Sequence, residues 1–138
     1  MSLKDKVCIV TGGNSGIGRG VAIKFAKEGA KVAIAGRTPA TLQEVADEIQ
    51  SLGGQIDTFS LDVANYSAVQ NMVKTVSKKY GKVDVLVNSA GGGALHKRTL
   101  TTTPEDMQQV LNSNLLGTIY FTQAVLPSML QAKQGTII

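Results

Sequence analysis

Five glycines stand close together between Val10 and Gly20, in the stretch VTGGNSGIGRG near the amino end of the chain. An apolar run precedes this stretch and an amphipathic one follows it, which places a loop between a strand and the start of a helix. Free backbone N–H groups and the positive end of the helix dipole make such a loop an anion site. Glycines let the backbone turn tightly and approach a phosphate, because no Cβ stands in the way. The stretch therefore predicts a binding site for a pyrophosphate group.

The spacing of these glycines separates two kinds of nucleotide site. Gly12, Gly16 and Gly18 give the pattern G-x-x-x-G-x-G. A phosphate loop for nucleoside triphosphates needs a lysine and then a serine or threonine after its last glycine. Arg19 and Gly20 stand there instead, so the lysine and the metal-binding hydroxyl are both missing. A glycine loop alone is weak evidence, since tight turns also use glycine, and the rest of the chain has to support it.

Apolar strand-like runs alternate with helical patterns along the whole chain. Five strands are predicted, at residues 6–12, 31–37, 55–62, 82–91 and 135–138. Apolar residues at helical spacing predict helices between them, with buried faces running through residues 17–26, 42–52 and 69–76 and in a long fourth helix from Thr103. Thr38 and Thr103 are placed to cap the second and fourth helices, each followed by a proline.

Continuous apolar strands joined by helices predict a parallel sheet covered on both faces. Right-handed crossovers then make the fold doubly wound and Rossmann-like. No repeat or linker interrupts the pattern, so we expect one domain over residues 1–138. The final residues Gly135 to Ile138 form only the opening of an apolar strand, and we expect this domain to be incomplete at its carboxyl end.

Four motifs in order resemble the short-chain dehydrogenase/reductase family, over the whole chain. The stretch from Thr11 to Gly18 matches the cofactor loop of that family. Leu61-Asp62-Val63 matches its adenine contact, and Asn88-Ser89-Ala90-Gly91 matches its N-N-A-G motif with serine in second place. Asn114 matches the asparagine of its fourth helix. The resemblance implies the following cofactor-binding residues in these motifs: Gly12, Asn14, Ser15, Gly16, Ile17, Gly18, Asp62, Val63, Asn88, Ala90 and Gly91.

Three of these polar residues also have simpler interpretations. Asp62 is placed where it could merely cap the third helix. Asn88 could be structural, holding loops by hydrogen bonds, and Asn114 could be a satisfied polar residue inside a helix. The resemblance implies instead that Asn114 is catalytic and holds a water for a proton relay.

The end of the second predicted strand bears on the choice between NAD and NADP. A cofactor without a 2′-phosphate is usually held there by an acid that accepts from the ribose hydroxyl. The expected position is Gly36, and no acid occurs between Glu28 and Glu44. Arg37 follows with a planar guanidinium that pairs with phosphate, and Thr38 adds a hydroxyl. We therefore predict Arg37 and Thr38 as cofactor-binding residues and NADP(H) as the preferred cofactor, although a solvated arginine at a strand end is the plainer interpretation.

The family resemblance implies hydride transfer between NADP(H) and a carbonyl or secondary alcohol of a small molecule. The family handles the proton with a serine and a Tyr-x-x-x-Lys pair. None of the three tyrosines, Tyr66, Tyr80 and Tyr120, has a lysine four places on. We therefore expect these residues to be the amino-terminal part of a longer enzyme and to be inactive alone. One rival hypothesis is a non-catalytic dinucleotide-binding protein that ends at Ile138. Another is a methyltransferase-like nucleoside binder, which would require an acid near Gly36 for the ribose hydroxyls.

Composition limits the partners. The net charge is +4 with scattered lysines, which argues against a nucleic-acid surface. Cys8 and His96 are single, so we expect no disulfide, no metal cluster and a buried thiol. No charge occurs between Asp106 and Lys133, yet the many polar groups there argue against a membrane span.

The uncharged fourth helix needs a second covered face. The resemblance implies a homodimer or homotetramer paired through this helix, although a neighbouring helix of the same chain could cover it instead. No signal peptide is recognised, because Lys4 to Val10 already has the pattern of a strand, and this predicts a cytoplasmic protein.

Overall fold

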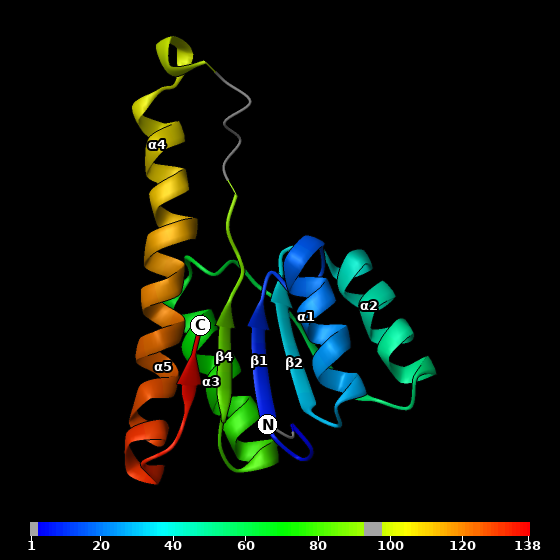
Figure 1. Ribbon diagram of the computed structural model, residues 1–138. Helices are drawn as coiled ribbons and strands as arrows, with labels where there is room; N and C mark the ends of the chain where they lie inside the picture. The colour runs from blue at the N-terminus through cyan, green and yellow to red at the C-terminus, as the bar shows by residue number, and fades with distance from the viewer. Residues whose placement is uncertain (1–2, 93–97) are drawn as a thin grey trace.

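Five parallel strands form one sheet in the computed structural model, which describes residues 3–92 and 98–138. The strands are β1 (Val7–Thr11), β2 (Lys31–Gly36), β3 (Gln55–Ser60), β4 (Val85–Asn88) and β5 (Thr136–Ile137). Their order is β3–β2–β1–β4–β5, as Figure 1 shows. The register places Thr11 beside Ala35 of β2 and beside Asn88 of β4, so these strands end at the same edge. The order reverses between β1 and β4, where doubly wound sheets open a crevice for a ligand.

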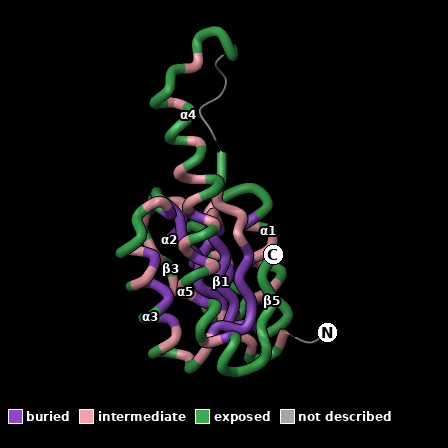
Figure 2. The backbone as a smooth tube through the Cα atoms, turned by 90° about the vertical axis from the view of Figure 1, so that its left-hand side faces the viewer, coloured by how far each residue is buried: buried purple, intermediate pink, exposed green. Residues whose placement is uncertain are grey.

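Helices cover both faces of the sheet, as predicted. They are α1 (Gly16–Lys27), α2 (Pro39–Ser51), α3 (Tyr66–Tyr80) and α5 (Gly117–Ala132), whereas α4 (Pro104–Leu111) lies beyond the sheet. Alternate residues of β1 divide between two buried cores. Val7 and Ile9 pack with α3 and α5, whereas Cys8 and Val10 pack with α1 and α2. Figure 2 shows the buried sheet between these exposed layers, and the prediction of a doubly wound Rossmann-like fold is confirmed.

Two residues assigned to buried helix faces lie at the surface. Ile17 is 83% exposed, because it stands in the first turn of α1, beyond the edge of the sheet. Leu52 is half exposed, because it follows the last turn of α2. The predicted positions of α2 from Leu42 to Ile49 are buried, whereas in α1 Ala22 and Ala26 are buried and Val21 and Phe25 are half-buried. Burial of the Cys8 thiol raises its pKa to about 12.

The predicted long fourth helix contains a break in its regular winding. Residues Asn112–Leu116 form a π-helical segment, η2, between α4 and α5. A π turn inserts an extra residue into the helix and rotates the side chains that precede it. Helix α4 extends past the carboxyl ends of the strands, as Figure 1 shows, while α5 packs on α3.

The predicted helix caps are partly correct. Thr103 caps α4 in a reciprocal pair with Asp106, each side chain accepting from the other backbone N–H. Thr38 occupies the cap position of α2, but its hydroxyl makes no capping bond. Asn65, and not Asp62, caps α3 by accepting from the N–H of Ala68. The Thr38 hydroxyl and the Asp62 carboxylate therefore take no part in helix capping.

Asp84 connects to β1 at the amino ends of the strands, the opposite edge of the sheet from the cleft. Its carboxylate is 7% exposed and accepts from the Val7 N–H at 3.0 Å. The ammonium groups of Lys82 and Lys6 lie 2.9 and 3.4 Å from it. Burial alone would raise the pKa of Asp84, but the Val7 N–H and the two lysines together hold it below its ordinary value of 3.8. The ionised form therefore stabilises the fold.

This ion cluster predicts a loss of stability in acid. Because the pKa of Asp84 is lower in the folded state, its stabilisation is complete at neutral pH and is lost as the pH falls through that lowered value. We expect Asp84→Asn to reduce the free energy of unfolding at pH 7 by about 2 kcal/mol and to flatten its dependence on acid pH. Urea unfolding at several pH values measures this. The exposed Asp47→Asn is the matched control, and equal pH profiles for Asp84→Asn and the unchanged protein would contradict the assignment.

Candidate cofactor-binding site

A cleft of about 850 Å³ opens at the carboxyl ends of the strands. Its walls come from the loop after β1, the ends of β2 and β3, the segment after β4, and the end of α4 with η2. The position of the cleft follows from the topology, because the chain leaves β1 and β4 toward opposite sides of the sheet. Ten of the predicted site residues line it, in three groups.

The first group is the glycine loop, where five predicted residues line the cleft: Gly12, Asn14, Ser15, Gly16 and Ile17. Gly12 has a φ of +64°, and its N–H donates to the Ala35 carbonyl at 2.8 Å. A Cβ on Gly12 would lie 2.9 Å from the backbone of Ala90. Only glycine therefore permits this close approach of the loops after β1 and β4.

Gly18 lies outside the cleft and has a packing role. A Cβ at this position would collide with the Gly12 carbonyl and stand 3.1 Å from the Ser89 hydroxyl. The residue is buried and lets α1 approach the two loops closely. Gly18 therefore shapes the loop from behind, which is one of the roles that glycines have in dinucleotide-binding turns.

The amino end of α1 presents donors to the cleft. Ser15 stands at the cap position, but its side chain makes no capping bond, and the first turn contains no acid. The first N–H groups of a helix have no partner within the helix. They and the positive end of the helix dipole can therefore hold an anion here. The side chain of Ile17, exposed beside them, offers an apolar contact.

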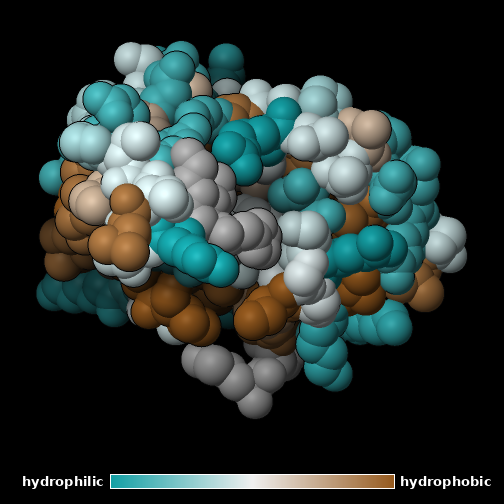
Figure 3. All heavy atoms as spheres, turned by 90° about the horizontal axis from the view of Figure 1, so that it is seen from above, coloured by the Kyte–Doolittle hydropathy of each residue, from teal (hydrophilic) through white to brown (hydrophobic). Residues whose placement is uncertain are grey.

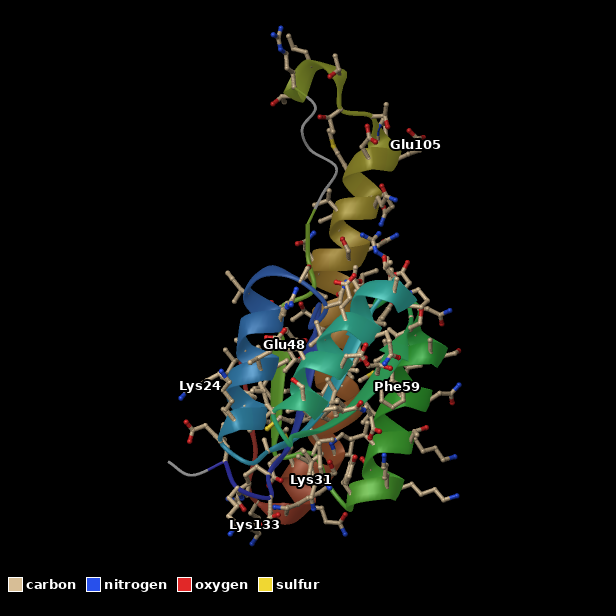
Figure 4. All side chains as sticks on the ribbon, turned by 90° about the vertical axis from the view of Figure 1, so that its right-hand side faces the viewer. Lys24, Lys31, Glu48, Phe59, Glu105 and Lys133 are labelled. Carbon is tan, nitrogen blue, oxygen red and sulfur yellow. The ribbon has the colours of Figure 1, made fainter. Side chains whose placement is uncertain are left out.

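The side chain of the neighbouring Arg19 forms an ion pair outside the cleft. Its guanidinium pairs with Glu48 of α2 at 2.8 Å and ties the two helices together. Figure 4 shows Glu48 on the side of α2 that faces α1. Arg37 is therefore the cation that lines the cleft, among the residues that the structure describes there.

The second group lies at the ends of β2 and β3 and contains Arg37, Thr38, Asp62 and Val63. Arg37 and Thr38 are exposed, and the Arg37 carbonyl accepts from the Ser60 hydroxyl at 3.3 Å, which holds the backbone here. Asp62 accepts from the Ala64 N–H at 2.9 Å in a tight turn. The side chain of Val63 is buried against Gly117 of α5. Val63 therefore offers its backbone, not its side chain, to a ligand.

The third group follows β4, where Gly91 lines the cleft but Asn88 and Ala90 do not. The Thr11 hydroxyl accepts from the N–H groups of Ser89 and Ala90, at 3.1 and 2.9 Å, and so joins the exits of β1 and β4. Asn88 Oδ1 is buried without a hydrogen-bond partner among the described residues. An orphaned buried acceptor is uncommon and marks a position that a ligand or a water can satisfy.

Asn114 reaches the same segment from the π-helical turn. Its Oδ1 accepts from the Gly92 N–H at 3.2 Å. Its Nδ2 donates to the carbonyls of Gly92 at 3.1 Å and Val110 at 2.9 Å. Asn114 thus holds the chain after β4 against the helix, and its side chain does not line the cleft.

The cleft also contains residues that the sequence analysis did not assign to a site. Among them are Ser89 and Gly92 after β4 and the helical residues Gln109, Val110, Asn112 and Ser113. The helical residues among them share one face at helical spacing, and this spacing was the signal in the sequence that could have placed them at the cleft. The π turn obscured it, because that segment does not follow the ordinary helical period.

Neither a metal-binding cluster nor a membrane-spanning helix occurs in the described residues. In residues 3–92 and 98–138, no three His, Cys, Asp or Glu side chains are grouped closely enough to hold a metal ion. His96 lies outside the described residues. No helix of the described part has both the length and the apolar character needed to cross a bilayer.

Sheet order, glycine loop and cleft together define a nucleotide-binding α/β protein of the Rossmann type. The family described as short chain dehydrogenase matches residues 6–138, and the chain belongs to that family. The chain is 38% identical over 140 aligned residues to 3-oxoacyl-(acyl-carrier-protein) reductase FabG of Thermotoga maritima. It is 39% identical to an uncharacterized oxidoreductase of Staphylococcus saprophyticus. Each alignment covers 100% of this chain but 56% and 59% of the relative, so the chain spans little more than half their length.

Solved structures agree with this assignment. A metagenomic short-chain oxidoreductase in complex with NADP superposes with a TM-score of 0.93 at 32% identity, over 99% of this chain and 62% of the other. A short chain dehydrogenase from Bacillus anthracis superposes with a TM-score of 0.90 at 39% identity, over 98% and 56%. These likenesses confirm the predicted family and fold.

Proposed function

We propose that this chain is the NADP(H)-binding part of an oxidoreductase that acts on a carbonyl or a secondary alcohol. The observation that carries the proposal is the cleft itself, where a glycine loop and a helix amino end face Arg37 and no acid stands at Gly36. Family membership supports the oxidoreductase class, and the NADP complex of one structural relative supports the cofactor.

In this proposal, different residues of the cleft bind different parts of the cofactor. The N–H groups of the loop from Gly12 to Gly18 hold the pyrophosphate, and Ile17 packs beside it. Arg37 pairs with the 2′-phosphate through its planar guanidinium, with the Thr38 hydroxyl as a second donor. The Asp62 carboxylate and the Val63 backbone bind the adenine edge.

The ribose on the other side of the pyrophosphate meets the segment after β4. Gly91 forms the backbone wall there, and Asn88 and Ala90 support it from behind, with the buried Oδ1 of Asn88 as an acceptor that a bridging water can satisfy. A bound nicotinamide cofactor supplies or accepts the hydride. Asn114 holds the chain at Gly92 through its hydrogen bonds. In this proposal it also holds a water of the proton relay. The family's Tyr-x-x-x-Lys pair is not among these 138 residues, so cofactor binding is the function proposed for them.

Titration of the protein with NADPH and NADH tests this proposal. We expect saturable binding of NADPH, with NADH weaker by about tenfold or more, since a charge-assisted hydrogen bond contributes about 1.5–3 kcal/mol. Isothermal calorimetry measures both affinities without requiring turnover. Equal affinities would contradict the NADP assignment, and failure to bind either cofactor would contradict the proposed function. Binding of NADPH without any turnover, by a protein no longer than these residues, would favour the rival hypothesis of a non-catalytic dinucleotide-binding protein.

We also propose that the long helix pairs two or more copies of the chain. Exposed apolar residues recur along α4, η2 and α5: Met107, Leu111, Leu115, Ile119, Leu126 and Leu130. Seen from above, hydrophobic residues are exposed on the left, where this helix lies, and also along the lower edge (Figure 3). An apolar stripe of this extent favours a protein partner, and sedimentation velocity would report a dimer or a tetramer.

A further inference from the structure

Gly36 stands at the end of β2, where an acid would hold the ribose of a cofactor without a 2′-phosphate. The space above this glycine is filled. A Cβ built on Gly36 would collide with Oδ1 of Asn14 and lie 2.8 Å from its Cγ. The side chain of Asn14 comes from the glycine loop, so two segments of the cleft share this volume.

A hydrogen bond holds the side chain of Asn14 over Gly36. Its Nδ2 donates to the Thr41 hydroxyl at 2.9 Å, and this hydroxyl donates in turn to the Thr38 carbonyl at 3.0 Å. Thr41 lies in the first turn of α2, directly after the Arg37–Thr38 segment. The Thr41 hydroxyl therefore links the Asn14 amide, which lies over Gly36, to the backbone carbonyl of Thr38.

We infer that Asn14 is a specificity-determining residue that closes the acid position at the end of β2 and positions the Arg37–Thr38 segment. The inference rests on the proposed function, because it concerns the choice between NADPH and NADH at that cleft. A side chain at position 36 has to displace the amide, and displacement breaks the bond to Thr41. The preference for a 2′-phosphate thus depends on a residue of the glycine loop as well as on Arg37.

The direct test is a pair of substitutions read by calorimetry. Gly36→Asp alone is expected to bind both cofactors at least about tenfold more weakly than the unchanged protein, because the displaced Asn14 amide distorts the loop. Gly36→Asp with Asn14→Ala is expected to bind NADH about tenfold more tightly than Gly36→Asp alone, since the carboxylate then has room. Gly20→Asp is the matched control, because a Cβ at Gly20 meets open space. NADH binding by Gly36→Asp as tight as by the double variant would overturn the inference.

A second measurement needs no cofactor and remains informative if the aspartate variant does not fold. Gly36→Ala is expected to lower the melting temperature by about 4 °C or more, and Asn14→Ala in the same chain is expected to restore most of that loss. Additive effects of the two substitutions would overturn the inference. This outcome is separate from failure of the proposed function, which would appear as equal or absent binding of NADPH and NADH by the unchanged protein.

Discussion

Replacing Arg37 with aspartate is expected to weaken NADPH binding by about 100-fold, the equivalent of about 2.7 kcal/mol. Charge-assisted hydrogen bonds to phosphate are lost, and the new carboxylate repels the phosphate. NADH has no 2′-phosphate, so its affinity should fall by no more than about threefold, the worth of a neutral contact. Calorimetric titration of both cofactors provides the two dissociation constants.

Lys78→Asp provides the matched control for the change in net charge. Lys78 is exposed near the carboxyl end of α3, at the opposite edge of the sheet from the cleft. Its replacement should leave both affinities unchanged within error. An equal loss of NADPH and NADH affinity in Arg37→Asp would reject the 2′-phosphate assignment, because the arginine would then act only on the shared part of the cofactor.

Gly12→Val should produce the largest loss of stability in the cleft. The left-handed φ of +64° strains a β-branched residue, and the added side chain meets the Ala90 backbone at 2.9 Å. Strain and overpacking each cost about 1–3 kcal/mol, so the free energy of unfolding should fall by about 3 kcal/mol or more. Urea unfolding monitored by circular dichroism measures this loss.

Gly53→Val separates the two causes. Gly53 has a similar φ of +75°, but nothing lies within 4 Å of its Cβ position. This variant should lose only the strain contribution, about 1–2 kcal/mol. Equal losses in Gly12→Val and Gly53→Val would show that the loops after β1 and β4 do not approach as closely as described.

The motifs indicated the cleft well, because each follows the end of a strand. Parallel strands end at one edge, so residues after β1, β2, β3 and β4 meet there whatever the details of packing. Ten of the predicted cofactor residues line the cleft for this reason. Gly18, Asn88 and Ala90 lie behind its wall, and spacing alone does not distinguish a residue that faces a ligand from one that supports it.

The order and type of the main elements, the two-sided burial of the sheet and the absence of an acid at Gly36 could all be read from the chain. These properties depend on periodicity, on glycine and proline positions, and on residue identity, which are local. The hydrogen bonds that complete the cleft are not local, since Thr11 and Ala90 are 79 positions apart, Asn14 and Thr41 are 27 apart, and Gly92 and Asn114 are 22 apart. Tertiary packing brings these groups together, and no spacing in the chain specifies which polar atoms then meet.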